Sequence, residues 1–400
     1  MRASGAISKT ICFFALHALF FFCKVLTYMR IQSKQTSLAL MMAAAAFFAS
    51  CEPKNELQTM SVYVTKGAIV LNSGNTRNSV DGSITFIDFT TELAEQSVFR
   101  EANGISLGGS LNDLIVHEGK IYVTGGEENT IFVLEPKTFR LIARISTTDG
   151  LGESEGECPN RLCAYADKVY FSTRGGYVGV IDTFSLSIEK KYQVGPYPEG
   201  LAVRPVGETL LLYVANSDEG FGCGSISVID LSTGSSSDWM NDKIRYPLEL
   251  LVVNDQIYVL NGGFLDENMV QKGTGFYLAD NSGANKLAPD ALLVSTIGYR
   301  LLYYRKSEAG DTGYSVLDIR SNSVLGFNFK GDDLNPIAEP GAMAIDPNTS
   351  NIMLASSPEG DDDIDPCHVN LYTGDGQFLK SFPAGVCPKR IVFLYGSPNG

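Results

Sequence analysis

Apolar and polar residues alternate along most of the chain after residue 60, and the alternation recurs in units that begin alike. A unit opens with a proline, which Leu111 replaces in one copy, and continues with alternating apolar residues, a turn and a second strand rich in aromatic residues. The units open at Leu111, Pro159, Pro198, Pro247, Pro289, Pro340 and Pro388. Their mean spacing of about 46 residues suits the four-stranded blade of a β-propeller.

A strand that ends in an acidic residue recurs later in each unit. The acids are Asp88, Glu135, Asp182, Asp230, Asp280 and Asp318, and Tyr372 takes this place in the last copy. A carboxylate at a strand end can accept hydrogen bonds from the backbone of the following turn. We therefore expect these acids to cap turns and not to form a ring of metal ligands.

The last unit, residues 388–395, supplies only one strand. Three further strands are predicted near the other end of the chain, in GAIVLNSG, GSITFIDFTT and AEQSVF. Pairing them with the C-terminal strand closes a ring and hides the sheet edges. The sequence thus predicts an all-β, seven-bladed propeller of four-stranded blades over residues 62–396. An open two-sheet sandwich is the alternative.

Residues 1–50 have a different character, with two apolar runs, several basic residues and no acidic residue. A short basic region, about a dozen apolar residues and small residues before Cys51 describe a secretory signal. We predict translation from Met29, which leaves 1–28 untranslated, a signal peptide over 29–50 and a tether over 51–61. A transmembrane anchor is the alternative.

The formal net charge of −14 argues against a nucleic-acid partner, whose phosphates need a basic surface. It also disfavours adhesion to anionic lipid, so a lipid anchor would be the contact with the membrane. Export of the chain makes disulfide bonds possible.

In a propeller, the connections into each innermost strand share one face with the connections between the second and third strands. We call this the top face. The long connections predicted there are 72–82, 101–110, 146–158, 216–224, 261–274, 330–340 and 356–367. Long loops on a rigid scaffold are where function usually resides.

Four cysteines are expected on this face. Cys367 and Cys387 lie in adjoining connections, and we predict a disulfide between them. Cys158 and Cys223 form a second candidate pair, and Cys163 is expected to be a buried thiol within a strand. The alternative is that all five are free thiols.

The second residue after each opening position is expected to ring the upper mouth of the central channel. These residues are Asp113, Arg161, Gly200, Glu249, Ala291, Ala342 and Arg390. Above them we expect Tyr197, Tyr246, Tyr177, Phe221 and Phe264. Polar groups with aromatics at a concave mouth suit a ligand platform. Alternatively, the charged residues pair across the channel and the aromatics pack loop to loop.

Enzyme signatures are poor. No nucleophile elbow, phosphate-binding loop or dinucleotide fingerprint is present, and His117 and His368 are expected near opposite faces.

The acidic stretch SSPEGDDDIDPCHVN places Asp361, Asp363 and Asp365 at alternate positions, as calcium loops do, but without a following bidentate glutamate. The alternatives are a solvated acidic rim and a partner contact. We predict no cofactor, with structural calcium as the exception.

Four segments carry a resemblance to a known family: residues 69–88, 101–123, 177–203 and 213–234. With them the chain resembles YncE-like seven-bladed propellers, and more closely the transporter-associated surface lipoproteins that include the cobalamin-binding BtuG proteins. Cys51 follows Ala49-Ser50 as the lipidated cysteine of bacterial lipoproteins does. The resemblance implies an outer-membrane lipoprotein, on the surface or periplasmic side, that captures a ligand for a TonB-dependent transporter.

Three functional hypotheses follow. The first is a non-catalytic, ligand-binding propeller lipoprotein whose ligand is a small molecule such as a cobalamin or a metal chelate. The second is a protein-interaction scaffold at the cell envelope, and the third is a calcium-dependent propeller hydrolase.

Overall fold

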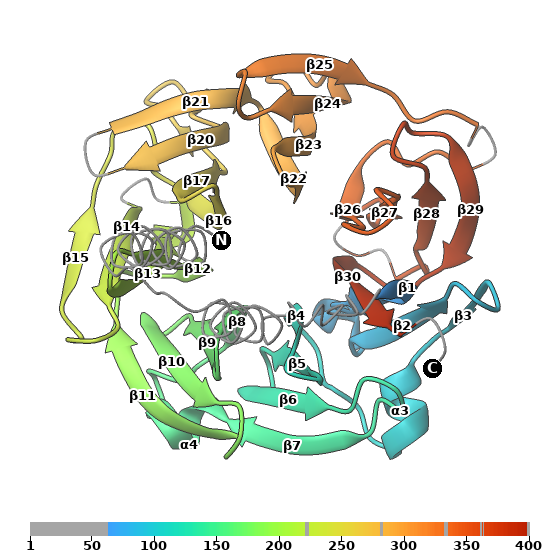
Figure 1. Ribbon diagram of the computed structural model, residues 1–400, viewed down its shortest axis with the longest axis horizontal. Helices are drawn as coiled ribbons and strands as arrows, with labels where there is room; N and C mark the ends of the chain where they lie inside the picture. Colours follow the sequence, from blue (N-terminus) through green and yellow to red (C-terminus); the bar gives the residue numbers. More distant parts are fainter. Residues whose placement is uncertain are drawn as a thin grey trace, which may run out of the picture. The chain divides into compact units, whose positions relative to one another are not determined.

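The computed structural model describes residues 63–220, 224–280, 283–331, 335–360, 362 and 364–397. These residues form seven four-stranded antiparallel sheets arranged around a central axis as a β-propeller (Figure 1). We number the blades 1 to 7 in ring order. No helix in the described part of the chain has the length and apolar character needed to cross a membrane.

Each blade is built from the axis outward. The innermost strands, from blade 1 to blade 7, are β30 (Pro388–Gly396), β4 (Leu111–His117), β8 (Pro159–Tyr165), β12 (Pro198–Val206), β16 (Pro247–Val253), β22 (Ala291–Ile297) and β26 (Pro340–Ile345). The second strands are β1 (Val64–Asn72), β5 (Lys120–Gly125), β9 (Lys168–Thr173), β13 (Thr209–Asn216), β17 (Gln256–Asn261), β23 (Arg300–Lys306) and β27 (Ile352–Ser356).

The outer half of each blade completes the sheet. The third strands are β2 (Ser83–Asp88), β6 (Thr130–Leu134), β10 (Tyr177–Asp182), β14 (Ser225–Asp230), β20 (Gly275–Asp280), β24 (Thr312–Asp318) and β28 (His368–Tyr372). The outermost strands are β3 (Leu93–Glu95), β7 (Leu141–Ser146), β11 (Ser187–Gln193), β15 (Ser236–Trp239), β21 (Gly283–Pro289), β25 (Ser323–Phe327) and β29 (Phe378–Pro383).

Several short helices, turns and a hairpin lie within the top connections. They are the helices α3 (Val98–Asn103) and α4 (Thr147–Leu151), the 3-10 turns Thr76–Asn78 and Asp218–Gly220, and the hairpin of β18 (Phe264–Leu265) and β19 (Gln271–Lys272).

The ring closes as the sequence predicts. Strand β30 from the C-terminal end pairs antiparallel with β1 from the N-terminal end, with Ile391 opposite Val70 and Phe393 opposite Ala68 (Figure 1). Over the described residues, the buried apolar side chains fall into seven clusters, one between each pair of neighbouring blades. Burial between blades is therefore what holds the ring together.

The acids at the ends of the third strands cap turns, which confirms the sequence interpretation. Asp230 Oδ1 accepts the backbone N–H of Ser232 at 2.8 Å, and Asp318 Oδ1 accepts that of Arg320 at 2.9 Å. The hydroxyl and N–H of Ser232 lower the pKa of Asp230 because they favour the ionised form.

The predicted opening of blade 6 at Pro289 is wrong by two residues. Ala291 pairs with Arg305 as Pro159, the first residue of β8, pairs with Thr173 in blade 3. Ala291 is therefore the first residue of its innermost strand. Pro289 instead ends β21 of blade 5. Ala291 is fully buried in the core between blades 5 and 6, and that packing decides the register.

Candidate functional site

Three of the predicted channel residues meet across the ring. Arg390 on β30 places its Nε 2.8 Å from Oδ1 of Asp113 on β4, and its Nη1 3.2 Å from Oε1 of Glu249 on β16. These residues come from blades 1, 2 and 5. The carboxylate of Asp113 raises the pKa of Arg390 further above its usual range. The alternative of charges paired across the channel is therefore what the structure shows for these three residues.

Asp113 is anchored from several sides. It is fully buried, and its carboxylate accepts the backbone N–H groups of Leu114 and Leu162, each at 2.9 Å. The second of these contacts crosses from blade 2 to blade 3. Asp113 therefore links three innermost strands, and its charge is compensated by Arg390.

A second charged pair stands beside the first. Arg161 Nε lies 3.8 Å from Oε2 of Glu199, which also accepts the side-chain amide of Asn160 at 2.7 Å. Burial raises the pKa of Glu199, although Arg161 and Asn160 oppose that shift. Glu199 was missed by sequence reasoning because it occupies the first position after its proline, whereas the ring was predicted from second positions.

Not every predicted ring residue presents a functional group. Gly200 lies where β12 approaches β16, and a Cβ placed on it would come within 2.7 Å of Cα of Glu249. Ala342 is buried in the core between blades 7 and 1, and Ala291 in that between blades 5 and 6. Sequence position alone does not identify the side chains that face the channel.

Tyr197 and Tyr246 both lie near Glu219. A hydrogen bond to the Glu219 carboxylate raises the pKa of Tyr197, and burial followed by the charges of Glu199 and Glu219 raises that of Tyr246. Both tyrosines are half-buried and directly precede the innermost strands of blades 4 and 5. Tyr246 is therefore close to Glu199 of the Arg161–Glu199 pair as well as to Glu219.

Two further predicted aromatics, Tyr177 and Phe264, each pack against a nearby cationic side chain. The ammonium of Lys191 lies 5.5 Å from the ring centre of Tyr177, and the guanidinium of Arg245 lies 4.5 Å from that of Phe264. Phe221 lies outside the described residues.

A recess of about 450 Å³ opens between blades 7 and 1 on the top face. Its polar wall is built by Asp81, Arg100 and Ser106: Arg100 Nη2 lies 2.9 Å and Ser106 Oγ 2.6 Å from Oδ2 of Asp81. Further lining residues are Ser79, Ser83, Gln96, Ser97, Phe99, Leu107, Pro366 and Val386. Hydroxyls, an amide, a cation and an anion therefore surround one concave space.

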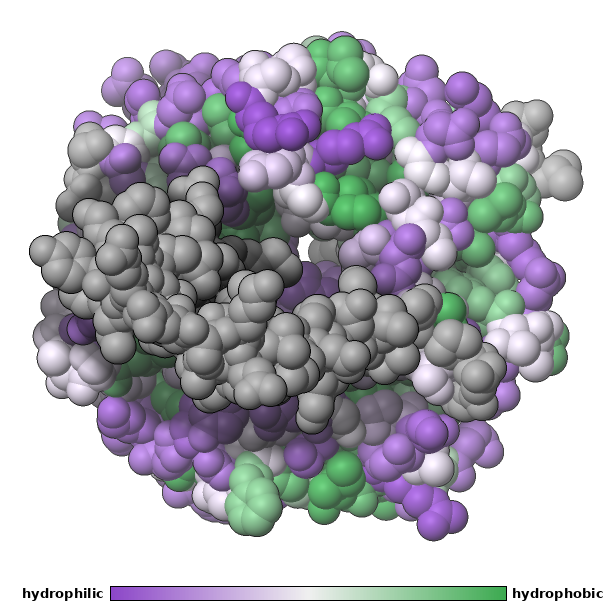
Figure 2. All heavy atoms as spheres, in the orientation of Figure 1, coloured by the Kyte–Doolittle hydropathy of each residue, from purple (hydrophilic) through white to green (hydrophobic). Residues whose placement is uncertain are grey.

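The recess was not predicted residue by residue, although three of the long top connections meet there. It is formed from the connections before β2 and before β4, and from the end of the acidic stretch at Pro366. The length of these three connections was the signal available in the sequence. In the view of Figure 2, hydrophilic and hydrophobic residues are interspersed around a small central opening.

The acidic stretch is joined to blade 1. The side-chain amide of Asn78 donates to the carbonyl of Asp362 at 3.1 Å. Asp361 and Asp363 lie outside the described residues, and Asp365 is exposed. Within the described ranges, no three His, Cys, Asp or Glu side chains are grouped so that they could hold a metal ion.

The predicted disulfide between Cys367 and Cys387 is not formed. The backbone of Cys367 exchanges hydrogen bonds with Ala384 and Gly385, and its side chain is buried in the apolar core between blades 7 and 1. Cys387 lies beyond that pairing, and its backbone carbonyl accepts the N–H of Ser73 instead. Cys158 is a free thiol here, and its proposed partner Cys223 lies outside the described residues, as does Cys51.

No family model matches the chain, and no curated protein matches it. Among solved structures, hydrazine synthase of Kuenenia stuttgartiensis is similar, with 12% identity over 68% of this chain and 85% of that chain and a TM-score of 0.52. This likeness supports the propeller fold and nothing finer.

Two further solved structures are similar with TM-scores below 0.5. The computationally designed Ika8 protein has 12% identity over 83% of this chain and 94% of that chain, with a TM-score of 0.49. The WD40 repeats of RRP9 have 12% identity over 69% of this chain and 81% of that chain, with a TM-score of 0.45.

Proposed function

We propose that this chain is a non-catalytic propeller lipoprotein that binds a small ligand on its top face, in the recess between blades 7 and 1. The carrying observation is the concave wall of Asp81, Arg100 and Ser106 built by long top connections. Such a wall offers donors and acceptors at fixed positions on a rigid scaffold. A polar ligand rich in amides or hydroxyls, such as a cobalamin, a metal chelate or a glycan, fits this chemistry.

The cellular setting rests on the sequence. The apolar run before Cys51 supports export and lipidation, and the resemblance to BtuG-like lipoproteins supports attachment to the outer membrane and delivery to a TonB-dependent transporter. Changing Cys51 to Ala should release the protein from the membrane fraction. Mass spectrometry should find no peptide from residues 3–28; such a peptide would contradict a start at Met29.

Ligand binding is tested by thermal shift with cobalamins, haem, iron chelates and glycans. A ligand that binds only the native state raises the melting temperature, by an amount equivalent to about 2.7 kcal/mol at a hundred times its Kd. Arg100→Ala and Asp81→Asn should each weaken that binding about tenfold or more.

The matched control is Arg144→Ala. Arg144 forms an exposed ion pair with Glu128 at 3.4 Å in blade 2, and neither residue lines the recess. It should leave ligand binding unchanged. Binding that survives Arg100→Ala and Asp81→Asn together would place the ligand elsewhere.

The scaffold hypothesis has one observation in its favour. The β18–β19 hairpin of blade 5 carries the exposed apolar side chains of Leu265 and Met269. Exposed apolar groups on a projecting hairpin suit contact with a protein partner. Co-purification of a partner that Leu265→Ser and Met269→Ser together abolish, with no thermal shift by any ligand, would favour this function.

A further inference from the structure

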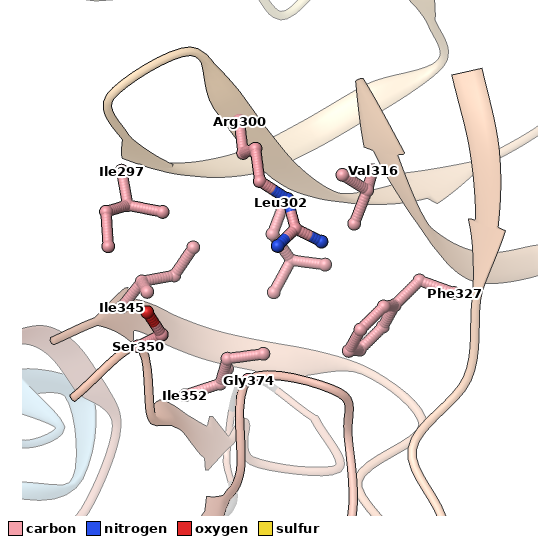
Figure 3. Close-up of a pocket in the computed structure, with 9 residues that line it drawn as sticks. All are labelled: Ile297, Arg300, Leu302, Val316, Phe327, Ile345, Ser350, Ile352 and Gly374. Atoms are coloured by element: carbon pink, nitrogen blue, oxygen red, sulfur yellow. The ribbon is translucent and has the colours of Figure 1, made fainter. Parts of the chain in front are cut away.

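A second cavity, of about 230 Å³, lies on the opposite face between blades 6 and 7. Its body is apolar and is lined by Ile297, Leu302, Val316, Phe327, Ile345 and Ile352. Arg300, Ser350 and Gly374 complete the lining (Figure 3). Phe327 ends the outermost strand β25, and the other eight residues belong to the inner, second and third strands or to the turns of that face. None of the nine lines the top recess.

The cavity is held open by hydrogen bonds on both sides. Toward the axis, the N–H of Ile345 on β26 donates to Ser295 Oγ on β22 at 3.1 Å. Toward the rim, Lys330 exchanges backbone hydrogen bonds with Gly376 and Phe378 at 2.9 and 2.8 Å. These contacts fix the separation of the two blades, so the space between them does not depend on a ligand.

Aromatic rings fill the outer part of the same interface and stop at the cavity. Phe329 packs on Tyr372 with ring centres 4.1 Å apart, and on Phe327 at 5.2 Å. Phe327 is the ring of this group that lines the cavity. The cavity is therefore bounded on its outer side by packed aromatic side chains.

The one cation of the lining has no carboxylate partner among the described residues. Figure 3 shows the guanidinium of Arg300 reaching down among the apolar side chains toward Leu302 and Phe327. Its cross-strand neighbour Asp318 is engaged elsewhere: Asp318 accepts the N–H groups of Arg320 and Ser321 and lies 3.5 Å from the Arg320 guanidinium. Ser350 adds a hydroxyl at the opening.

We propose that this cavity binds a small amphipathic monocarboxylate, with an aromatic or branched aliphatic body among the isoleucines and its carboxylate on Arg300 and Ser350. A cavity of about 150 Å³ lined by Leu, Ile and Phe holds benzene, so the larger volume here has room for a ring and a short chain. A guanidinium pairs well with a carboxylate through two parallel hydrogen bonds. This inference does not depend on the function proposed for the top face.

The test is calorimetric titration of the intact protein with 3-phenylpropionate and with the uncharged 3-phenylpropan-1-ol. The acid should bind saturably, and the alcohol about tenfold more weakly or worse because it lacks the charge. Arg300→Gln should weaken the acid to the level of the alcohol without changing the binding of the alcohol. Equal binding of acid and alcohol, or no binding of the acid, would overturn the proposal.

Three further variants assign the site. Arg140→Gln removes another exposed arginine from the turns of the same face in blade 2, and it should change nothing. Ile297→Trp fills the cavity and should abolish binding of both compounds, with thermal unfolding used to show that the variant folds. Arg100→Ala should leave 3-phenylpropionate binding intact, so the two proposals fail separately. Binding of the acid that survives both Arg300→Gln and Ile297→Trp contradicts this site.

Discussion

Two arginine–aspartate pairs of nearly equal geometry occupy different regions of this propeller. In the channel, Arg390 lies 2.8 Å from Asp113, and on the top face Arg100 lies 2.9 Å from Asp81. Their surroundings differ: the side chains of Arg390 and Asp113 are 33% and 0% exposed, whereas those of Arg100 and Asp81 are 56% and 45% exposed.

The difference shows that burial, and not distance, decides what an ion pair does. A buried carboxylate whose partner is removed keeps the cost of its desolvation, so the channel pair is structural. An exposed pair contributes little to stability and can exchange its partner for a ligand. Asp113, Glu249 and Arg390, which the sequence predicted as ligand contacts, are thus paired with one another in the channel. The exposed charges of Arg100 and Asp81 in the recess are the ones that remain accessible to a ligand.

The largest expected effect is that of Arg390→Met. The change leaves the fully buried Asp113 without its cation, and Glu249 loses its partner as well. We expect the free energy of unfolding to fall by about 3 kcal/mol. Urea denaturation measures it, with Arg390→Lys as the variant that keeps the charge and should lose less. A fall of under about 1 kcal/mol would place the channel pair in the same class as the exposed pair.

A smaller loss is expected from Gly200→Ala, which disturbs the channel without removing a charge. The added Cβ would lie 2.7 Å from Cα of Glu249 and 2.9 Å from the Leu248 carbonyl, so β12 and β16 must move apart. Overpacking of this kind costs about 1–3 kcal/mol. Gly326→Ala on β25 is the matched control for the added methyl, because a Cβ at Gly326 meets no atom within 4 Å and its φ is not positive. Equal losses in the two variants would show that the close approach of the strands is unimportant.

Glu199→Gln tests the second channel pair through pH. Burial raises the folded pKa of Glu199, so between the ordinary glutamate pKa and this raised value the folded chain binds more protons than the unfolded chain. The free energy of unfolding therefore falls as pH rises through that window. The variant lacks this dependence, and its stability relative to the wild type should be greater at pH 7 than at pH 4. Urea denaturation at both pH values decides; a difference that is the same at both would refute the assignment.

The smallest effect on stability is expected from Arg100→Ala. The pair with Asp81 is exposed, so its loss should change the free energy of unfolding by about 0–1 kcal/mol. Denaturation in urea should therefore separate it clearly from Arg390→Met, even though the same change is expected to weaken ligand binding. A loss as large as that of Arg390→Met would mean that the recess is structural too.

Particular elements show how far sequence reasoning reaches. The proline-led inner strands, the acids that cap turns at Asp230 and Asp318, and the pairing of β30 with β1 were all predicted, because alternation and turn chemistry are local signals that repeat. Blade 6 broke the rule, since Pro289 is not its first residue and buried Ala291 sets the register.

The sequence by itself determined the architecture: seven matched units, each too small to bury its own sheet faces, must stack and close into a ring. It also named the channel charges Asp113, Glu249 and Arg390, since repeat position places them near the axis. Only the tertiary structure decided that these charges satisfy one another, that Asp81, Arg100 and Ser106 share a recess, and that blades 6 and 7 enclose an apolar cavity beside Arg300. The physical reason is that partners and cavities depend on which loops and blade faces meet, and contacts between distant segments leave no period in the chain.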